Sequence, residues 1–345
     1  MAARISDIAK QATVSNATVS LVLNEKPGVG QETRERVLQI AEQLGYKKPG
    51  SEGPTPSTGT IRFLKIARHG HTVNRDHTVF IADYIDGLTY EAKVHGLKIE
   101  ILSYNSTPIE EIVGALLRDS QIQGAVVLGT ELSREDVMAF RELSMPIVFL
   151  DTFIDFIPFD FVDMNNLDSV YRIVEYLFSR GHRDIGMVRS SVETRNFQLR
   201  YIGFLQTMEA LHFPVREEYI FDCDSTFDGA YRDMRAILQK MLRSDTNLPS
   251  ALFCTNDIIA SGVLKALREE GYRIPDDISI IGFDDLPSSA VVEPPLTTIA
   301  VSKQEIGKAA VDRLVHRIAN PDSPAVKVVV GGILIERESV RFLGG

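Results

Sequence analysis

The chain has 345 residues, of which 44% are hydrophobic and 24% charged, and these ordinary proportions exclude a mostly disordered or fibrous protein. No apolar run approaches the roughly 20 residues of a membrane-spanning helix, and Met1 leads into a polar segment instead of an export signal. Two cysteines, Cys223 and Cys254, are too few for a disulfide framework or a zinc site. We therefore expect a cytoplasmic protein without a cofactor or membrane anchor, with room for two or three folding units.

The first 48 residues contain three short helical segments. Ser6 is expected to cap the first, the second opens at Val14-Ser15, and Gly45 ends the third. Such short helices bury only a small core, which leaves the middle helix free to enter a DNA major groove about 12 Å wide. This part carries seven Lys and Arg against five Asp and Glu, whereas the rest carries 30 against 42. The basic excess lies where phosphate contacts need it, and we predict a helix-turn-helix DNA-binding domain over residues 1–48.

Residues 49–59 are rich in proline and glycine and predict a linker. From residue 60 onward, short apolar runs alternate with amphipathic helical stretches, which predicts parallel sheets covered by helices on both faces. Ligands of such folds bind at the carboxyl ends of the strands. The expected strands are 61–67, 97–102, 125–128, 147–150, 185–188, 251–253 and 278–283, and the expected helices are 81–94, 169–180, 200–211, 257–270 and 303–318.

Short motifs follow one another in a fixed order along nearly the whole chain. In the first domain they are Ile-Ser-Asp-Ile-Ala at 5–9, Val-Ser-Asn-Ala-Thr-Val-Ser at 14–20, Glu-Thr-Arg-Glu-Arg-Val at 32–37 and Leu-Gly-Tyr at 44–46. In the body they include Gly-His-Arg at 181–183, Thr-Asn-Asp at 255–257, Gly-Phe-Asp-Asp at 282–285 and Pro-Pro-Leu-Thr-Thr at 294–298. In this order they resemble the lactose-repressor (LacI) family of bacterial transcription regulators.

The resemblance implies a helical headpiece followed by a body that looks like a periplasmic sugar-binding protein, with two doubly wound parallel-sheet subdomains closing on a small molecule. It implies a homodimer that represses a carbohydrate-use operon and changes its operator affinity when a sugar or sugar derivative binds. We place the effector-binding and dimerisation domain at 60–345. Its first subdomain is expected near 60–161 and 296–322, and its second near 162–295 and 323–343.

The resemblance places DNA contacts at the start of the second helix. Asn16 pairs with an adenine or reaches a phosphate, unless it only caps the helix. Ala17 suits contact with a thymine methyl group, while Thr18 and Ser20 suit phosphate oxygens. Leu21 stands where many relatives carry a polar residue, so the operator is expected to depart from the family's commonest half-site. The predicted DNA-binding residues are Ser6, Ser15, Asn16, Ala17, Thr18, Ser20, Leu21 and Asn24.

Two further departures from the family pattern affect the headpiece and its linker. Thr13 occupies a turn where relatives usually have Gly or Asn, and a left-handed conformation there would cost a β-branched residue about 1 kcal/mol. The linker lacks the Ala-Arg-x-Leu sequence with which relatives form a hinge helix and wedge a leucine into the minor groove. Because Gly50, Pro54 and Pro56 stand in this stretch, we expect no regular hinge helix and weak wedging at most.

For the effector site, the resemblance indicates Arg200, Asn256 and Asp284, although Asn and Asp also suit turns at strand ends. Asp151 either lies near the ligand or only caps a turn. The apolar candidates are either core residues or a surface on which a sugar stacks. The predicted effector-binding residues are His71, Asn74, Arg75, Phe80, Ile81, Thr130, Asp151, Arg200, Phe227, Asn256 and Asp284.

Three histidines, His69, His71 and His77, lie within nine positions after the first expected strand. The segment is a solvated loop, an effector contact or a metal site, although its spacing fits no common zinc pattern. Arg75 beside them favours an anionic or highly hydroxylated ligand.

Other functional classes fit the sequence less well. An exported sugar-binding protein would need a signal peptide and no helical headpiece. An enzyme would need a reactive constellation, and the chain has no Walker phosphate loop, no Gly-x-Ser-x-Gly and no His-Glu-x-x-His. We therefore expect no enzymatic activity. The alternative function is a ligand-binding sensor with weak or no DNA binding.

Overall fold

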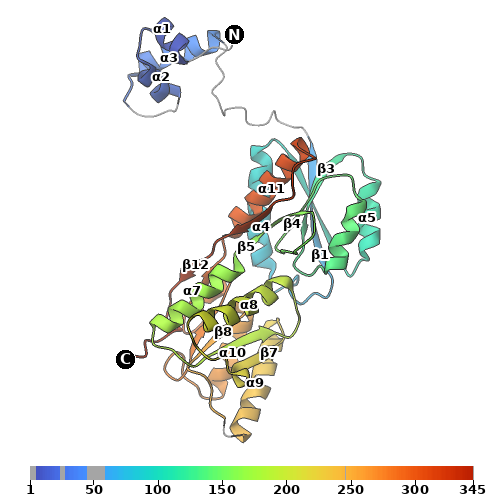
Figure 1. Ribbon diagram of the computed structural model, residues 1–345, viewed down its shortest axis with the longest axis vertical. Coiled ribbons are helices and arrows are strands. Elements are labelled where there is room, and N and C mark those ends of the chain that lie inside the picture. Colours follow the sequence, from blue (N-terminus) through green and yellow to red (C-terminus); the bar gives the residue numbers. More distant parts are fainter. Residues whose placement is uncertain (1–4, 24–27, 45–58, 245, 345) are drawn as a thin grey trace. The chain divides into compact units, whose positions relative to one another are not determined.

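The computed structural model describes residues 5–23, 28–44, 59–244 and 246–344 (Figure 1). The chain divides into two compact units, Met1–Ser57 and Thr58–Gly345. Each unit has a hydrophobic core of its own. Asn24 and almost all of the expected linker lie outside the described residues, so the irregular hinge stays a prediction.

The described part of the first unit consists of three helices, α1 (Ile5–Ala12), α2 (Asn16–Leu23) and α3 (Gln31–Gln43). Apolar residues recur every three or four positions in them, so their apolar faces meet in one small core. The prediction that Ser6 caps the first helix is wrong, because α1 already begins at Ile5 and Ser6 is an exposed residue of its first turn. The core residues are Ile8, Ala9, Ala12, Val19, Val22, Val37 and Ala41.

Thr13 joins α1 to α2 in a left-handed backbone conformation, with a φ of +56°. In this region the Cβ atom of any residue crowds the backbone, and a β-branched side chain is poorly suited to it. The turn still satisfies its backbone, because the N–H of Val14 donates to the carbonyl oxygen of Ala9 at 3.0 Å. The headpiece therefore carries local backbone strain at Thr13.

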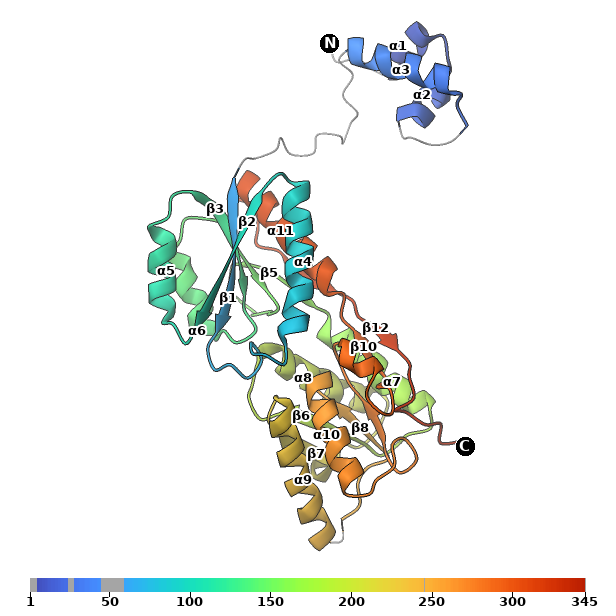
Figure 2. The same cartoon turned by 180° about the vertical axis from the view of Figure 1, so that it is seen from behind.

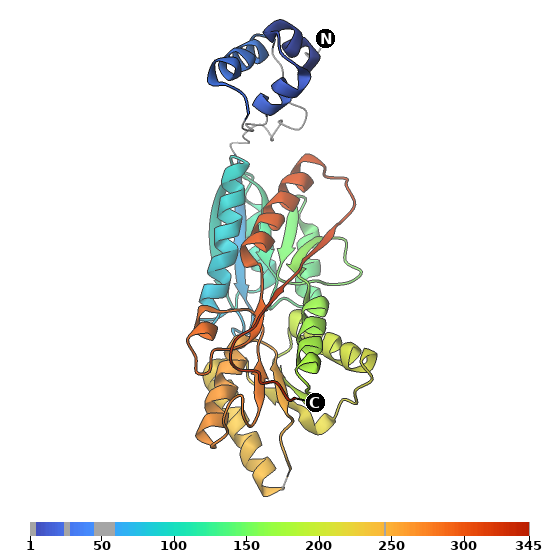
Figure 3. The same ribbon diagram turned by 90° about the vertical axis from the view of Figure 1, so that its left-hand side faces the viewer.

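The first sheet of the second unit has six parallel strands. Their order is β11 (Lys327–Val330), β5 (Asp160–Met164), β4 (Ile147–Leu150), β3 (Ile122–Leu128), β1 (Thr60–Ala67) and β2 (Lys98–Asn105). Helices α4 (Thr78–Val94) and α11 (Lys303–Ala319) cover one face, where they lie side by side (Figure 3), and α5 (Ile109–Leu117) and α6 (Arg134–Ala139) cover the other. Because both faces are covered, the inner strand β4 is a continuous apolar run and β3 is nearly so, whereas the edge strand β2 largely alternates apolar with polar residues.

The second sheet has four parallel strands in the order β7 (Ile220–Cys223), β6 (Ile185–Ser190), β8 (Ala251–Cys254) and β9 (Ser279–Ile281). One face packs on α7 (Asn166–Ser179) and α8 (Arg195–Ala210), and the other on α9 (Phe227–Arg243) and α10 (Asp257–Glu269). A separate antiparallel pair, β10 (Thr298–Ala300) and β12 (Ile333–Ile335), continues toward this sheet through single bridges. The predicted α/β body of two parallel sheets is confirmed.

The chain passes between the two sheets three times: after β5, between β10 and α11, and between β11 and β12. We placed these crossings near residues 161, 295 and 322, and β5, β10 and β11 end a few residues later, at Met164, Ala300 and Val330. The pairing of the short strands shows where the chain crosses. The strands β5 and β11 pair with each other in the first sheet, whereas β10 is bridged to the segment that follows β9. The apolar pattern shows where a run ends but not which sheet a short strand joins.

Helices α4 and α11 approach each other closely at two glycines. A Cβ atom at Gly87 would lie 2.1 Å from the carbonyl oxygen of Gln304, and one at Gly307 would lie 2.5 Å from the carbonyl oxygen of Tyr84. No side chain fits in these positions. The two helices therefore pack backbone to backbone and hold the first subdomain together.

We predict that Thr13→Asn stabilises the headpiece by about 1 kcal/mol, because asparagine tolerates the left-handed conformation better than threonine. In the full chain, amides of α1 and α2 that exchange only when the headpiece unfolds should then exchange about fivefold more slowly, as followed by mass spectrometry. Thr13→Ala is the control, because alanine has no such tolerance. Equal exchange rates in the asparagine and alanine variants would contradict the assignment of strain.

Candidate functional site

A cleft lies between the two sheets, at the carboxyl ends of their strands. The space between its walls amounts to about 420 Å³ and includes open solvent, whereas the cavity volume itself is about 30 Å³. Both subdomains contribute residues, and Figure 2 shows the segment between β1 and α4 at the junction of the two sheets. The lining residues are Thr72, His77, Phe80, Ile81, Thr130, Asp151, Met164, Thr194, Asn196, Phe197, Arg200, Asn256 and Asp284.

Asp151 follows β4 and receives hydrogen bonds from both subdomains. Its carboxylate accepts from the hydroxyl of Tyr84 at 2.9 Å, from the Thr130 hydroxyl, and from the side-chain amide of Asn196 at 3.0 Å. Its φ of +61° is unusual for a residue with a side chain. These three donors come from other elements, so Asp151 is more than the local turn cap that we considered.

Arg200 of α8 is almost fully buried, and each nitrogen of its guanidinium group has a partner. Its Nε donates to Asn166 at 2.9 Å, one Nη donates to the carbonyl oxygen of Thr255 at 2.7 Å, and the other contacts Met164 Sδ at 3.0 Å and Asp284 at 3.4 Å. The group also lies over the ring of Phe283, 3.7 Å from its centroid. Its charge is thus fully engaged within the protein.

Acceptors outnumber free cationic donors around the cleft. Burial raises the pKa of both Asp151 and Asp284 to about 6, while Arg200 opposes both shifts. Burial also raises the pKa of Asp163, whose Oδ2 has no hydrogen-bond partner. The ammonium group of Lys303 donates to the carbonyl oxygen of Asp284 at 2.7 Å. The cleft is therefore suited to a ligand that donates hydrogen bonds.

Asn256 and His77 meet across the cleft. Asn256 caps α10 by accepting from the N–H of Ile259 at 2.8 Å, which leaves its amide nitrogen to donate to His77 Nε2 at 3.2 Å. Burial lowers the pKa of His77 to about 4, so the ring is neutral near pH 7. Its Nδ1 lies 3.1 Å from the side-chain oxygen of Asn74 and donates to it. Both interpretations of Asn256 hold, because it caps a helix and also lines the cleft.

Seven of the predicted effector residues line this cleft, and four do not. Asn74 holds the segment before α4 by bonding the His71 carbonyl group at 2.8 Å, and Arg75 is exposed. His71 contributes its carbonyl oxygen to Ser225 at 2.8 Å, not its ring to the cleft. Phe227 begins α9 and lines a separate hollow with Lys265, whose ammonium lies 5.7 Å from the ring centroid. The seven cleft residues are Phe80, Ile81, Thr130, Asp151, Arg200, Asn256 and Asp284.

Six lining residues were not predicted: Thr72, His77, Met164, Thr194, Asn196 and Phe197. Three of them follow β6, where Thr194 caps α8 by accepting from the N–H of Phe197 at 3.3 Å. We expected this helix to begin at residue 200, but α8 already begins at Arg195, five residues after β6 ends, and the strand-end rule would have selected this stretch.

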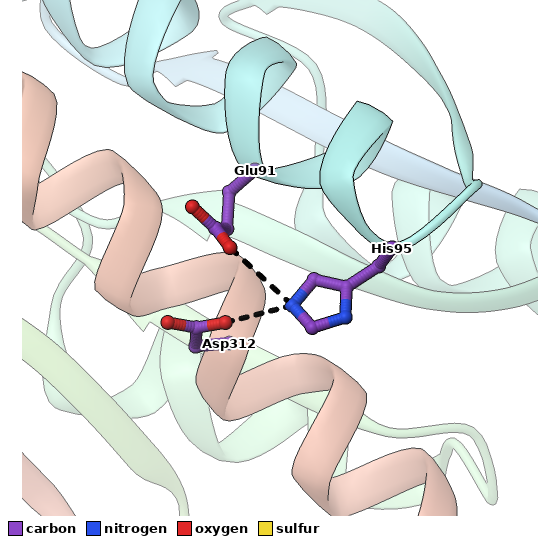
Figure 4. Close-up of side chains that lie close together, drawn as sticks. All are labelled: Glu91, His95 and Asp312. Atoms are coloured by element: carbon purple, nitrogen blue, oxygen red, sulfur yellow. Dashed lines mark hydrogen bonds and ion pairs between the residues drawn. The ribbon is translucent and has the colours of Figure 1, made fainter. Parts of the chain in front are cut away.

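Three histidines after β1 do not share one centre. His69 Nδ1 lies 3.4 Å from Glu131, His71 Nδ1 lies 3.3 Å from Asp224, and His77 faces Asn256. A different trio, Glu91, His95 and Asp312, brings three ligand-type atoms together between α4 and α11 (Figure 4). His95 Nε2 lies 2.8 Å from Asp312 and 3.5 Å from Glu91. One nitrogen of the imidazole, Nε2, thus bridges both carboxylates, while His95 Nδ1 is buried without a hydrogen-bond partner.

The start of α2 is exposed, as a DNA-reading surface requires. Ser15 caps the helix by accepting from the N–H of Thr18 at 3.1 Å, and its hydroxyl lies 2.9 Å from that of Thr18. Asn16 is the first residue of α2, and its side chain is exposed, as is that of Ala17. The alternative in which Asn16 only caps the helix is therefore wrong, since Ser15 has that role. Thr18, Ser20 and Leu21 are partly buried.

Comparison with known proteins agrees with this architecture. The profile described as "Bacterial regulatory proteins, lacI family" matches residues 4–48, and that of a "Periplasmic binding protein-like domain" matches residues 174–340. The "HTH-type transcriptional repressor PurR" of Pasteurella multocida (strain Pm70) is 30% identical over 342 residues, 98% of this chain and 99% of that protein. The chain belongs to the lacI family of bacterial regulatory proteins. The "Probable HTH-type transcriptional repressor ExuR" of Bacillus subtilis (strain 168) is 28% identical over 98% of both chains.

Solved structures of transcription regulators have the same fold. The "transcriptional regulator CelR-cellobiose complex" superposes with a TM-score of 0.71 at 23% identity, over 98% of this chain and 99% of that one. The lac repressor dimer bound to operator and the anti-inducer ONPF gives 0.70 at 22% identity, over 99% and 100%. The headpiece and the repressor relatives make this LacI-family protein a ligand-responsive transcriptional repressor. Within the residues that the structure describes, no helix has both the length and the hydrophobicity to cross a bilayer.

We predict that Arg200→Met lowers the free energy of unfolding of the body by about 3 kcal/mol, because it leaves the buried carboxyl group of Asp284 without its cation. Urea denaturation followed by circular dichroism measures the change. Arg189→Met is the matched control: its pair with Asp222 is partly exposed, with a closest approach of 2.8 Å, and is worth less than about 1 kcal/mol. Similar losses in both variants would show that the Arg200 cluster is not special.

The lowered pKa of His77 predicts a pH dependence. The unfolded chain takes up a proton at this histidine near pH 6.5, but the folded chain does so only near pH 4. Stability should therefore fall as the pH drops from 6.5 to 4, by up to about 3 kcal/mol from this residue. His77→Gln should flatten the curve of unfolding free energy against pH over that interval. An unchanged slope would mean that His77 is solvated and titrates normally.

Proposed function

We propose that this protein is a homodimeric repressor of a carbohydrate-use operon whose effector is a neutral, hydroxyl-rich molecule such as a sugar or sugar derivative. The acceptor-rich cleft carries this proposal. Sugar hydroxyl groups donate hydrogen bonds, and the carboxylates of Asp151 and Asp284 accept them, as does the side-chain oxygen of Thr130. Apolar lining from Phe80, Ile81 and other residues suits the C–H face of a sugar ring.

The same cleft argues against a phosphate or a carboxylate as the main recognition group. The N–H groups of Arg200 already donate to protein partners, and the ammonium group of Lys303 donates to the carbonyl oxygen of Asp284. Arg75, which favoured an anion in the sequence, is exposed and does not line the cleft. An added anion would also face Asp151 and Asp284 at close range, which costs energy in a buried site. Of the two ligand types that the sequence left open, we propose the hydroxylated one.

Two LacI-family neighbours are consistent with this choice. The CelR structure holds cellobiose, and a regulator from Enterococcus faecium with a TM-score of 0.67 at 21% identity holds ribose. For DNA, we propose that Asn16, Ala17 and Thr18 of α2 meet the major groove, with Leu21 one turn on. Two headpieces related by a two-fold axis would read half-sites about one helical turn apart.

Selection from random duplex DNA tests the proposal, performed with and without a panel of neutral sugars, sugar phosphates and nucleosides. We expect a near-palindromic sequence whose occupancy changes with one neutral sugar. A response only to a sugar phosphate or a nucleoside would overturn the effector class. The absence of any enriched DNA would favour the alternative, a ligand-binding sensor with little DNA binding.

We predict that Asn16→Ala weakens binding to the selected operator by about 1–3 kcal/mol, the usual value of one good side-chain contact to a base. The salt dependence of binding should change little, because a base contact releases no counterion. Gln39→Ala, at an exposed position of α3, should leave the affinity unchanged. An equal loss of affinity on all sequences would instead place Asn16 on a phosphate.

A further inference from the structure

The segment 68–73, which follows β1, is folded around one buried carboxylate, that of Glu131. This side chain is 0% exposed. Its Oε2 accepts the backbone N–H groups of three residues and its Oε1 those of two more, together with one hydroxyl. The donors are Arg68 N at 2.7 Å, His69 N at 2.9 Å, Gly70 N at 2.9 Å, Thr72 N at 2.8 Å, Thr72 Oγ1 at 3.0 Å and Val73 N at 2.7 Å.

This carboxylate replaces secondary structure for the segment. Residues 68–75 form bends without helix or strand, so their N–H groups lack the regular backbone partners that buried amides require. Successive N–H groups that converge on one anion form a known type of concave backbone site, here filled from within the protein. Burial opposes the charge of Glu131, but the amide bonds outweigh it and lower its pKa to about 2. The group is therefore ionised at any pH near neutrality.

Three hydrogen bonds run from the same segment and its continuation to the second subdomain. Their acceptors belong to His71, Asp76 and His77, and their donors lie at the N-termini of α9 and α10 or just before. The pairs are Ser225 Oγ to the His71 carbonyl oxygen at 2.8 Å, the Phe227 N–H to Asp76 Oδ2 at 3.2 Å, and Asn256 Nδ2 to His77 Nε2 at 3.2 Å. The segment thus connects the two halves of the cleft as well as lining it.

We propose that Glu131 is a positioning residue of the effector cleft, which fixes the segment so that Thr72 and His77 form part of the wall and the two subdomains join across it. Glu131 is well removed in sequence from the segment that it organises, by 58 to 63 positions. The consequence of this role rests on the proposed function, in which an effector binds in the cleft. Because the two subdomains are already joined in this way, these contacts determine how much free energy effector binding must supply to close the cleft.

Glutamine is nearly isosteric with glutamate but cannot replace it here. Its amide nitrogen would face backbone N–H groups in place of one acceptor oxygen, which leaves two or three buried donors unsatisfied. Glu131→Gln should therefore release the segment while changing the volume of the side chain very little. Glu142→Gln, an exposed position just after α6, is the matched control.

Hydrogen exchange of the full chain, without DNA or effector, tests the proposal at two sites: the backbone amides of the segment 68–73 and the backbone amide of Phe227. In Glu131→Gln we expect at least tenfold faster exchange in the segment 68–73. We also expect faster exchange at the Phe227 amide on the other subdomain, because its acceptor, Asp76, is no longer held in place. The control variant should match the unmodified chain in both places.

Faster exchange in 68–73 with an unchanged Phe227 amide would overturn the proposal, because Glu131 would then act only locally. Exchange that also rises within β3 and β8 would indicate global destabilisation, and Glu131→Asp then decides. Aspartate keeps the charge but is too short to reach both groups of donors. Glu131→Asp should therefore speed exchange in the segment 68–73 and at Phe227 while β3 stays protected. Loss of protection from exchange in the segment, at Phe227 and in β3 together would overturn the proposal. The proposed function can fail in the DNA selection without affecting this result.

Discussion

The buried guanidinium group of Arg200 is the interaction on which the rest of the cleft depends. It joins the end of β5 in the first sheet, the start of α7, the residue after β8 and the loop after β9, through Met164, Asn166, Thr255 and Asp284. A cation in a buried site is tolerated only where acceptors surround it on every side. The strand ends must therefore keep this arrangement, and other residues that line the cleft are positioned around it.

The surroundings of Arg200 also explain the unusual backbone at the two acidic positions. Asp151 and Asp284 both have a positive φ, of +61° and +116°. Such conformations cost energy and persist where neighbouring contacts determine them. Here the contacts are the hydroxyl groups around Asp151 and the Arg200 and Lys303 groups around Asp284. The strain and the raised pKa values occur together because both result from placing carboxylates at a closed junction.

Much of the fold and about half of the cleft could be predicted from the sequence. Long apolar runs such as 61–67 mark central strands, and the family motifs fix their order. The expected strands omit β5 and β7, whose apolar runs are interrupted by aspartate, and also the short strands β10, β11 and β12. The resemblance indicated Asp151, Asn256 and Asp284, all of which lie close to the carboxyl ends of strands, those of β4, β8 and β9. It could not find Glu131 or correct Phe227, because their positions depend on contacts between segments far apart in the sequence.

The three crossings between the sheets have a mechanical consequence. Two subdomains that are joined by three neighbouring chain segments resist sliding past each other. The movement that remains available to them is rotation about these connections. The headpiece continues covalently only into β1, a strand of the first sheet. Within one chain, the first subdomain is therefore the part of the body that is directly connected to the headpiece, and rotation between the two subdomains is the movement that a change in the cleft can alter.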